Sequence, residues 1–299
     1  MKDIYNILSN IKSLKTSLYE GLLRGQQSTL DSGEEAIFEV IKEFLKKNYK
    51  GKWIISEKPN KDGLYEVSSN EDIEVKNTKI TSLTNSLFTW TGVKGRFDCS
   101  DCNSLKTLEG APKEVGGDFY CPGCNSLKTL EGAPKEVGGD FYCPGCNSLK
   151  TLEGVPEKVG GDFNCYYCGG LKSLEGAPKE VGGDFYCPNC NSLETLEGAS
   201  EKVGCSFSCV KCNSLKTLEG APKEVGCDFY CSNCNSLETL KGAPEIIKGN
   251  FTCNNCNSLE TLKGAPKEVG GDFVCSFCGK FFPKYYIEKE FKVKGNIHI

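Results

Sequence analysis

Residues 115–136 read VGGDFYCPGCNSLKTLEGAPKE, and residues 137–158 repeat this stretch almost unchanged as VGGDFYCPGCNSLKTLEGVPEK. The first cysteines of nine Cys-x-x-Cys pairs follow one another at steps of 22 residues, with no insertion. These cysteines are Cys99, Cys121, Cys143, Cys165, Cys187, Cys209, Cys231, Cys253 and Cys275. A fixed period of this length predicts a repeat solenoid, in which each coil packs mainly against its two neighbours.

Each position of the unit predicts a place in the coil. Phe119 and Cys121 alternate with Tyr120, as side chains do along a short strand, so phenylalanine and cysteine are expected inside and tyrosine outside. Leu127 and Leu130 recur in every copy and are expected to face inward on the return arm. The arm also contains Glu-Gly-Ala-Pro, which has no helical period, so we expect an extended segment or a tight turn there.

The predicted ladder of strands extends beyond the clear repeats at both ends. Residues 73–75 and 297–299 both match the strand pattern, which gives eleven strands in all. At about 4.8 Å per strand, this ladder is roughly 50 Å long. We therefore expect a degenerate first coil (71–96), the tandem 22-residue repeats (97–278) and a C-terminal capping coil (279–299).

Residues 1–70 lack the repeat and predict a small helical α+β cap over the open end of the solenoid. Ile4 and Leu8 begin a helical spacing that predicts a first helix. A capping signal at Ser32 predicts the start of a second helix, and two strands are expected at 53–55 and 64–67. The helices can serve as a cap alone or also dock a partner, and the sequence leaves both open.

The run Phe119-x-Cys121-x-x-Cys124-x-x-Leu127 resembles the strand and turn of leucine-rich repeats. The resemblance is closest to the short repeats of bacterial or phage proteins, and it covers about residues 73–299. It implies a right-handed coil with one parallel sheet, little helix in the arms and partner binding through the concave strand face. Two features depart from the family: phenylalanine replaces the usual leucine, and the link from the inward valine to the strand is one residue longer.

The resemblance also implies a structural role for the second cysteine of each pair. In leucine-rich repeats, asparagine or cysteine at this place points inward and hydrogen-bonds backbone groups of its own and adjacent coils. The predicted cysteine ladder consists of Cys102, Cys124, Cys146, Cys168, Cys190, Cys212, Cys234, Cys256 and Cys278.

A metal site is the main alternative for these cysteines, because Cys-x-x-Cys is half of a four-thiolate zinc site. Burial beside phenylalanine disfavours thiolates, so we expect reduced thiols, no metal and no cofactor. Cys205 and Cys227 lie outside the pairs and replace the second glycine of two adjacent repeats. Their register permits a disulfide, but drift at two glycine positions explains them better.

Composition narrows the function classes. The formal net charge of -4, with acidic and basic residues interleaved, lacks the basic footprint of a nucleic-acid-binding protein. We see no transmembrane run and no secretory signal, so we expect a cytoplasmic monomer with no membrane or nucleic-acid partner. The only histidine is His298, and we find no catalytic motif, so we do not expect an enzyme.

A column of aspartates precedes the predicted strands and allows two interpretations. Stacked carboxylates can bind calcium, or they can accept hydrogen bonds from backbone amides of the glycine turn. The column comprises Asp118, Asp140, Asp162, Asp184, Asp228 and Asp272.

The outward strand position and the two residues between the paired cysteines vary most from copy to copy, whereas the arm hardly varies. This contrast, and the frequency of tyrosine, predict a binding face, and drift among recently duplicated copies explains the contrast equally well. Its expected residues are Tyr120, Tyr142, Asn164, Tyr166, Tyr167, Tyr186, Lys211 and Tyr230. The expected function is a non-catalytic protein-binding scaffold. A cysteine-rich metal or redox protein and a structural component of a phage or cell assembly are the alternatives.

Overall fold

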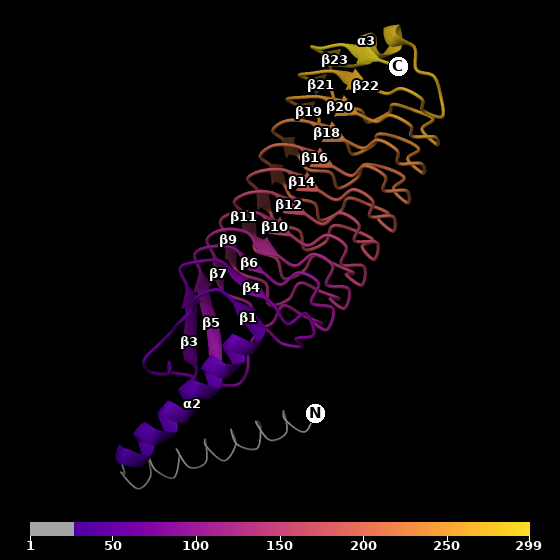
Figure 1. Cartoon of the computed structure of the whole chain (residues 1–299). Helices are drawn as coiled ribbons and strands as arrows, with labels where there is room; N and C mark the ends of the chain where they lie inside the picture. Colours follow the sequence, from indigo (N-terminus) through magenta and orange to yellow (C-terminus); the bar gives the residue numbers. More distant parts are fainter. Residues whose placement is uncertain (1–26) are drawn as a thin grey trace.

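A computed structural model describes residues 27–299 of the protein. The first predicted helix lies outside the described residues. From helix α2 onward, the chain winds into a long solenoid whose C-terminus lies at the end opposite α2 (Figure 1). The 22-residue repeat forms a β-solenoid, as the sequence predicts, and two sheets run along its whole length.

Sheet A contains the predicted phenylalanine strands. Its eleven parallel strands match the predicted number, and β1 (Tyr49–Lys50) joins the edge at β4 in antiparallel pairing. The parallel strands are β4 (Ile73–Val75), β6 (Phe97–Asp98), β8 (Phe119–Tyr120), β10 (Phe141–Tyr142), β12 (Phe163–Asn164), β14 (Phe185–Tyr186), β16 (Phe207–Ser208), β18 (Phe229–Tyr230), β20 (Phe251–Thr252), β22 (Phe273–Val274) and β24 (Ile297–His298).

Sheet B was not expected, because the resemblance implies only one sheet. It forms because the segment that ends in the inward valine, or in Ile247, is extended and stacks in register on its equivalent in the next coil; for example, Gly138 N–H donates to the Val115 carbonyl. Its strands are β2 (Ile54–Ile55), β3 (Tyr65–Ser69), β5 (Phe88–Val93), β7 (Glu114–Val115), β9 (Glu136–Val137), β11 (Lys158–Val159), β13 (Glu180–Val181), β15 (Lys202–Val203), β17 (Glu224–Val225), β19 (Ile246–Ile247), β21 (Glu268–Val269) and β23 (Lys292–Val293).

The return arm of each repeat is extended and contains no helix, as expected. Arms also bond to one another, since the N–H of Leu130 donates to the Glu153 carbonyl at 2.9 Å. The arm then turns at Gly132, and this turn requires glycine. Gly132 has a φ of 86°, and a Cβ there would lie 2.3 Å from the backbone nitrogen of Glu109. Close stacking of coils therefore fixes glycine at this turn.

The core is a set of columns in which each side chain meets its own equivalent in the next coil. The nine phenylalanines from Phe97 to Phe273 are fully buried, and the ring centroids of neighbours lie 5.0–5.8 Å apart. The two leucines of the arm, the valine of sheet B and both cysteines fill the remaining interior, with most at or near zero exposure. This continuity makes the coils depend on one another for a complete core.

Helix α2 (Gln27–Asn48) covers the first coil. Ile41 and Leu45 are fully buried, and the Phe44 ring meets Phe88 edge-on at 5.6 Å. The helix already includes Gln27, so the predicted start at Ser32 is wrong; residues 27–31 contain no proline or glycine that would end it earlier. Strands β2 and β3 appear where expected, and β3 continues sheet B into the repeats.

The last coil differs from the extended arm that the sequence suggests. A short helix, α3 (Lys284–Glu290), follows Pro283 and buries Ile287. Phe291 then stacks on Phe273 at 6.1 Å, so it extends the aromatic column by one ring. Proline at the start of the segment and the longer spacing were the signals for this helix.

We expect Phe185→Ala to lower the free energy of unfolding by about 3–5 kcal/mol, because it opens a cavity between two stacked rings. Urea denaturation followed by circular dichroism measures this loss. Glu194→Ala on the exposed arm is the control and should change stability by less than about 0.5 kcal/mol. Equal losses in the free energy of unfolding for the two variants would contradict a stabilising role of the phenylalanine column.

Candidate binding face

The cysteine ladder has a uniform geometry. The thiol of Cys124 donates to the carbonyl oxygen of Cys99 in the preceding coil at 3.2 Å. The same bond recurs in every later coil at 3.1–3.3 Å and links Cys146, Cys168, Cys190, Cys212, Cys234, Cys256 and Cys278 to the preceding coil. Cys102, in the first repeat, is buried but has no earlier repeat below it. These thiols act as hydrogen-bond donors that link each coil to the preceding one.

The first cysteine of each pair is an apolar filler. Cys121 is fully buried, and contact with the Cys146 thiol together with burial raises its pKa well above the ordinary thiol value. Cys143, Cys165 and Cys187 show the same shift for the same two reasons. Within residues 27–299, no group of three or more histidine, cysteine, aspartate or glutamate side chains is arranged to hold a metal ion. Neutral, buried thiols are poor metal ligands.

The aspartate column bonds to the backbone. The Oδ1 of Asp118 accepts the N–H of Asp140 at 2.9 Å, and that of Asp140 accepts the N–H of Asp162 at 2.8 Å. The pattern continues to Asn296, with Asn250 in place of one aspartate and Ser206 Oγ accepting at 3.3 Å in place of another. The second interpretation of this column therefore agrees with the geometry: each side chain satisfies an amide at the turn between the sheets.

Tyrosines cluster on the outer face of sheet A and the adjoining turn. The Tyr120 and Tyr142 rings lie 5.0 Å apart, and the Tyr142 hydroxyl lies 2.9 Å from that of Tyr166. Tyr167 meets Tyr166 edge-on at 5.3 Å, and the Arg96 guanidinium lies 5.5 Å from the Tyr120 ring. We call Tyr120, Tyr142, Tyr166 and Tyr167 the aromatic cluster. Arg96 was not predicted as a site residue, although it occupies the place of the aspartate in the first repeat of the aspartate column.

The other predicted site residues lie apart from the cluster. Tyr186 and Tyr230 each donate a hydrogen bond to the aspartate two residues earlier, at 2.7 and 2.5 Å. Asn164 lies beneath Tyr166, and its side-chain oxygen accepts the Tyr166 N–H at 3.2 Å, which positions the cluster. Lys211 is exposed on the same turn two coils further along.

The turn between paired cysteines holds side chains in a strained conformation. Its second residue has a φ of 56–69° in all nine repeats, in the left-handed region. Glycine, asparagine or aspartate, which tolerate this region, occupy six of these places, but Tyr167, Lys211 and Phe277 occupy the other three. Tyr167 and Phe277 are also 55% and 83% exposed. Bulky residues therefore project into solvent where the backbone disfavours them, and Phe277 was another residue that sequence reasoning missed.

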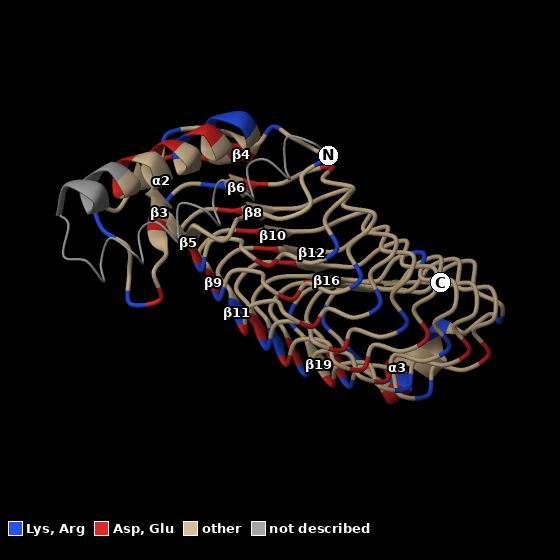
Figure 2. Ribbon diagram, turned by 90° about the horizontal axis from the view of Figure 1, so that it is seen from below, with Lys and Arg blue, Asp and Glu red and all other residues tan. Residues whose placement is uncertain are grey.

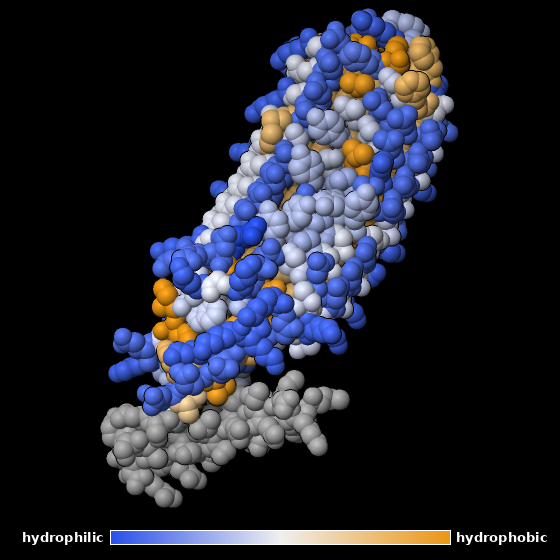
Figure 3. All heavy atoms as spheres, in the orientation of Figure 1, coloured by the Kyte–Doolittle hydropathy of each residue, from blue (hydrophilic) through white to orange (hydrophobic). Residues whose placement is uncertain are grey.

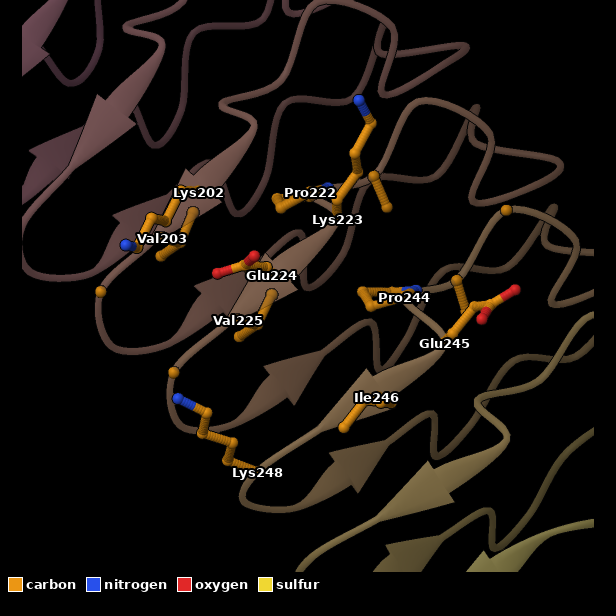
Figure 4. Close-up of a pocket in the computed structure, with 15 residues that line it drawn as sticks. Lys202, Val203, Pro222, Lys223, Glu224, Val225, Pro244, Glu245, Ile246 and Lys248 are labelled. Carbon is orange, nitrogen blue, oxygen red and sulfur yellow. The ribbon is translucent and has the colours of Figure 1, made fainter.

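Sheet B offers a weaker candidate. A shallow groove of about 710 Å³ runs over β15, β17 and β19 and is lined by Pro222, Glu224, Pro244, Ile246 and Lys248 (Figure 4). Charges of both signs alternate along this side of the solenoid (Figure 2), and the ion pairs they form between coils, such as Lys158 with Glu180 at 3.4 Å, are exposed. Exposed pairs contribute little to stability. None of the predicted site residues lies in this groove.

No protein-family model, curated protein or solved structure matches this chain. The class that the fold defines is therefore stated from its geometry: a β-solenoid of 22-residue coils with a cysteine ladder. Among helices of residues 27–299, none has the length and apolar character needed to cross a bilayer.

We expect Lys211→Asn to raise the free energy of unfolding by about 0.5–1 kcal/mol, because asparagine tolerates the left-handed backbone better than lysine. Thermal and urea denaturation measure the gain. Lys216→Asn makes the same chemical change on the exposed arm, where φ is negative, and should not stabilise. A loss of stability at position 211 would show that the lysine side chain makes compensating contacts.

We expect the effect of Tyr230→Phe to depend on pH. Its hydrogen bond to Asp228, together with burial, raises the pKa of Tyr230 from 10 to about 12. Only the neutral phenol donates this bond, so its contribution is complete below pH 10 and is lost as the pH rises through 12. Tyr230→Phe should lower the denaturant concentration at the midpoint of unfolding at pH 8, and it should lower this concentration less at pH 11. An equal effect at both pH values would contradict the assignment.

Proposed function

We propose that the protein is a non-catalytic, leucine-rich-repeat-like scaffold that binds a protein partner through the outer face of sheet A and its adjoining turns. The observation that carries the proposal is the aromatic cluster. Four tyrosines from three consecutive coils touch one another on the surface, and one of them occupies a backbone conformation that costs roughly 1–2 kcal/mol for a bulky side chain.

The chemistry of the cluster fits a protein surface. Tyrosine offers apolar area and a hydroxyl with few rotatable bonds, and it is enriched at binding hot spots. The Arg96 guanidinium beside Tyr120 and the carboxylates beneath the rings add polar groups at the rim. Such a surface suits a partner with exposed apolar and cationic side chains.

The constancy of the rest of the coil supports the same view. The arm residues and the core repeat almost unchanged, whereas the outward strand position changes from Tyr142 to Asn164, Tyr186 and Ser208 in successive coils. Variation confined to one face is what a scaffold with a selected surface requires. We propose that the protein is a cytoplasmic monomer without a nucleic-acid or membrane partner, because most of its cysteines are buried and unpaired and its acidic and basic residues are interleaved.

The metal or redox alternative is less well supported, because first cysteines such as Cys121 are buried with a raised pKa and second cysteines such as Cys124 donate to carbonyl groups. The hypothesis of a structural component in a phage or cell assembly makes a different prediction. Such a component would co-purify with large particles, and one partner protein would not be enough to account for its binding.

A photo-cross-linking experiment tests the proposal. With p-benzoylphenylalanine in place of Tyr167, extract from cells that contain the protein should yield one discrete cross-linked protein, and the same group at Lys150 on the arm should not.

Converting Tyr142, Tyr166 and Tyr167 together to alanine should weaken binding of that partner at least tenfold. The matched control converts Lys128, Lys150 and Lys172 on the arm to alanine. Equal losses in both triple variants, or a cross-link only at Lys150, would refute the proposal.

A further inference from the structure

Two adjacent coils depart together from the repeat at the turn between sheets B and A. Cys205 and Cys227 replace the second glycine of the turn, and Ser206 replaces the aspartate that follows it. They lie on the turns β15–β16 and β17–β18, which stack on each other, and the Cys227 N–H donates to the Cys205 carbonyl at 2.9 Å.

A side chain at this turn ordinarily collides with the preceding coil. A Cβ at Gly139 would lie 2.1 Å from Asp118 Oδ1, and at Gly249 it would lie 2.2 Å from Asp228 Oδ1. The residue in the same relation to Cys227 is Ser206, whose shorter side chain lacks the carboxylate. The Ser206 hydroxyl still accepts the Asp228 N–H at 3.3 Å, so the exchange makes room for Cys227 and preserves the hydrogen bond. Cys205 stands in the same relation to Asp184, which keeps its carboxylate, so the exchange to serine relieves only the contact at position 227.

The two thiols are positioned to join. Their Sγ atoms lie 2.7 Å apart, and equivalent residues of neighbouring strands have Cα atoms about 4.8 Å apart, which is within the range of disulfides. Both side chains are partly exposed, whereas the cysteines of the ladder are buried except Cys278. The ladder thiols from Cys124 onward donate to carbonyl groups of the preceding coil, and the Sγ atoms of Cys275 and Cys278 approach only to 3.6 Å.

We propose that Cys205 and Cys227 form a reversible disulfide cross-link between adjacent coils, with a small-molecule disulfide such as oxidised glutathione as the oxidant. One protein thiolate attacks the oxidant, forming a mixed disulfide and releasing one glutathione. The second thiolate attacks the mixed disulfide at the protein sulfur, forms the bond between positions 205 and 227 and releases the second glutathione. The protein loses two electrons and two protons, and the oxidant gains both.

The cross-link has a defined mechanical effect. It closes a loop of one 22-residue period, so the two coils can no longer separate when the solenoid opens locally. It joins the coil that carries Ser208 on the strand face to the coil that carries Tyr230. Oxidation therefore stiffens the middle of the array without touching the aromatic cluster, and this inference stands apart from the proposed binding function.

The full-length protein, equilibrated with reduced and oxidised glutathione and then alkylated under denaturing conditions, tests the proposal. We expect eighteen of the twenty cysteines to be alkylated in the oxidising buffer and all twenty in the reducing buffer. Tryptic peptides read by mass spectrometry should be joined through Cys205 and Cys227. Twenty alkylated cysteines in both buffers, a bond at other positions or an intermolecular dimer would overturn the proposal.

A variant that restores the repeat provides the control. Cys205→Gly combined with Cys227→Gly restores the second glycine of both turns, so the variant should fold and should keep all eighteen remaining thiols in the oxidising buffer. Oxidation should raise the Tm of the wild-type protein by roughly 5 °C and leave that of the double variant unchanged. An equal Tm shift in both proteins would assign the effect to other cysteines and refute the cross-link.

Discussion

In-register stacking at a period of 22 residues is the constraint on which the whole molecule depends. Each residue lies beside its own equivalent in the next coil, in both sheets and along the arm. A residue is therefore suitable at a given place only if it can stack on a copy of itself. Phenylalanine, leucine and valine satisfy this condition inside, and glycine satisfies it where backbones of successive coils approach too closely for a Cβ.

Polar groups meet the same condition through hydrogen bonds between coils. An aspartate stacked on an aspartate would repel it, but each carboxylate here accepts a backbone N–H from the following coil, which offsets the repulsion. The buried thiols solve the corresponding problem inside the core by donating to carbonyls. Burial raises the pKa of Asp162, and the hydrogen bond that its carboxylate accepts from the Asp184 N–H opposes this shift.

The sequence predicted the strands of sheet A and the inward positions because the repeat averages over nine copies of the same local signal. It did not predict sheet B, because a two-residue strand such as Glu114–Val115 has no periodicity of its own and forms only when neighbouring coils align. The same limit applies to α3, which occurs once and gains nothing from repetition. The predicted tyrosines do form a surface, but only the structure separates the four that touch from the two that are tied to aspartates.

The surface around the aromatic cluster is otherwise mainly hydrophilic, and apolar side chains gather instead toward the ends of the solenoid (Figure 3). Near the C-terminal end, Phe277, Phe281 and Tyr285 are all more than 70% exposed. The cluster differs from these end regions because its rings carry hydroxyl groups, and those of Tyr142 and Tyr166 bond to each other. Such a surface stays ordered in water without a partner.

The uniform register of the coils determines how the length of the protein can change during evolution. Loss or gain of one complete unit, by slippage between near-identical gene segments, leaves every remaining coil with a neighbour of the same shape, because each coil contacts only those next to it. The length of this protein can therefore change in steps of 22 residues among descendants without a new fold having to be found. What changes is the number of coils between the aromatic cluster and the two ends of the solenoid, and therefore the distance between them.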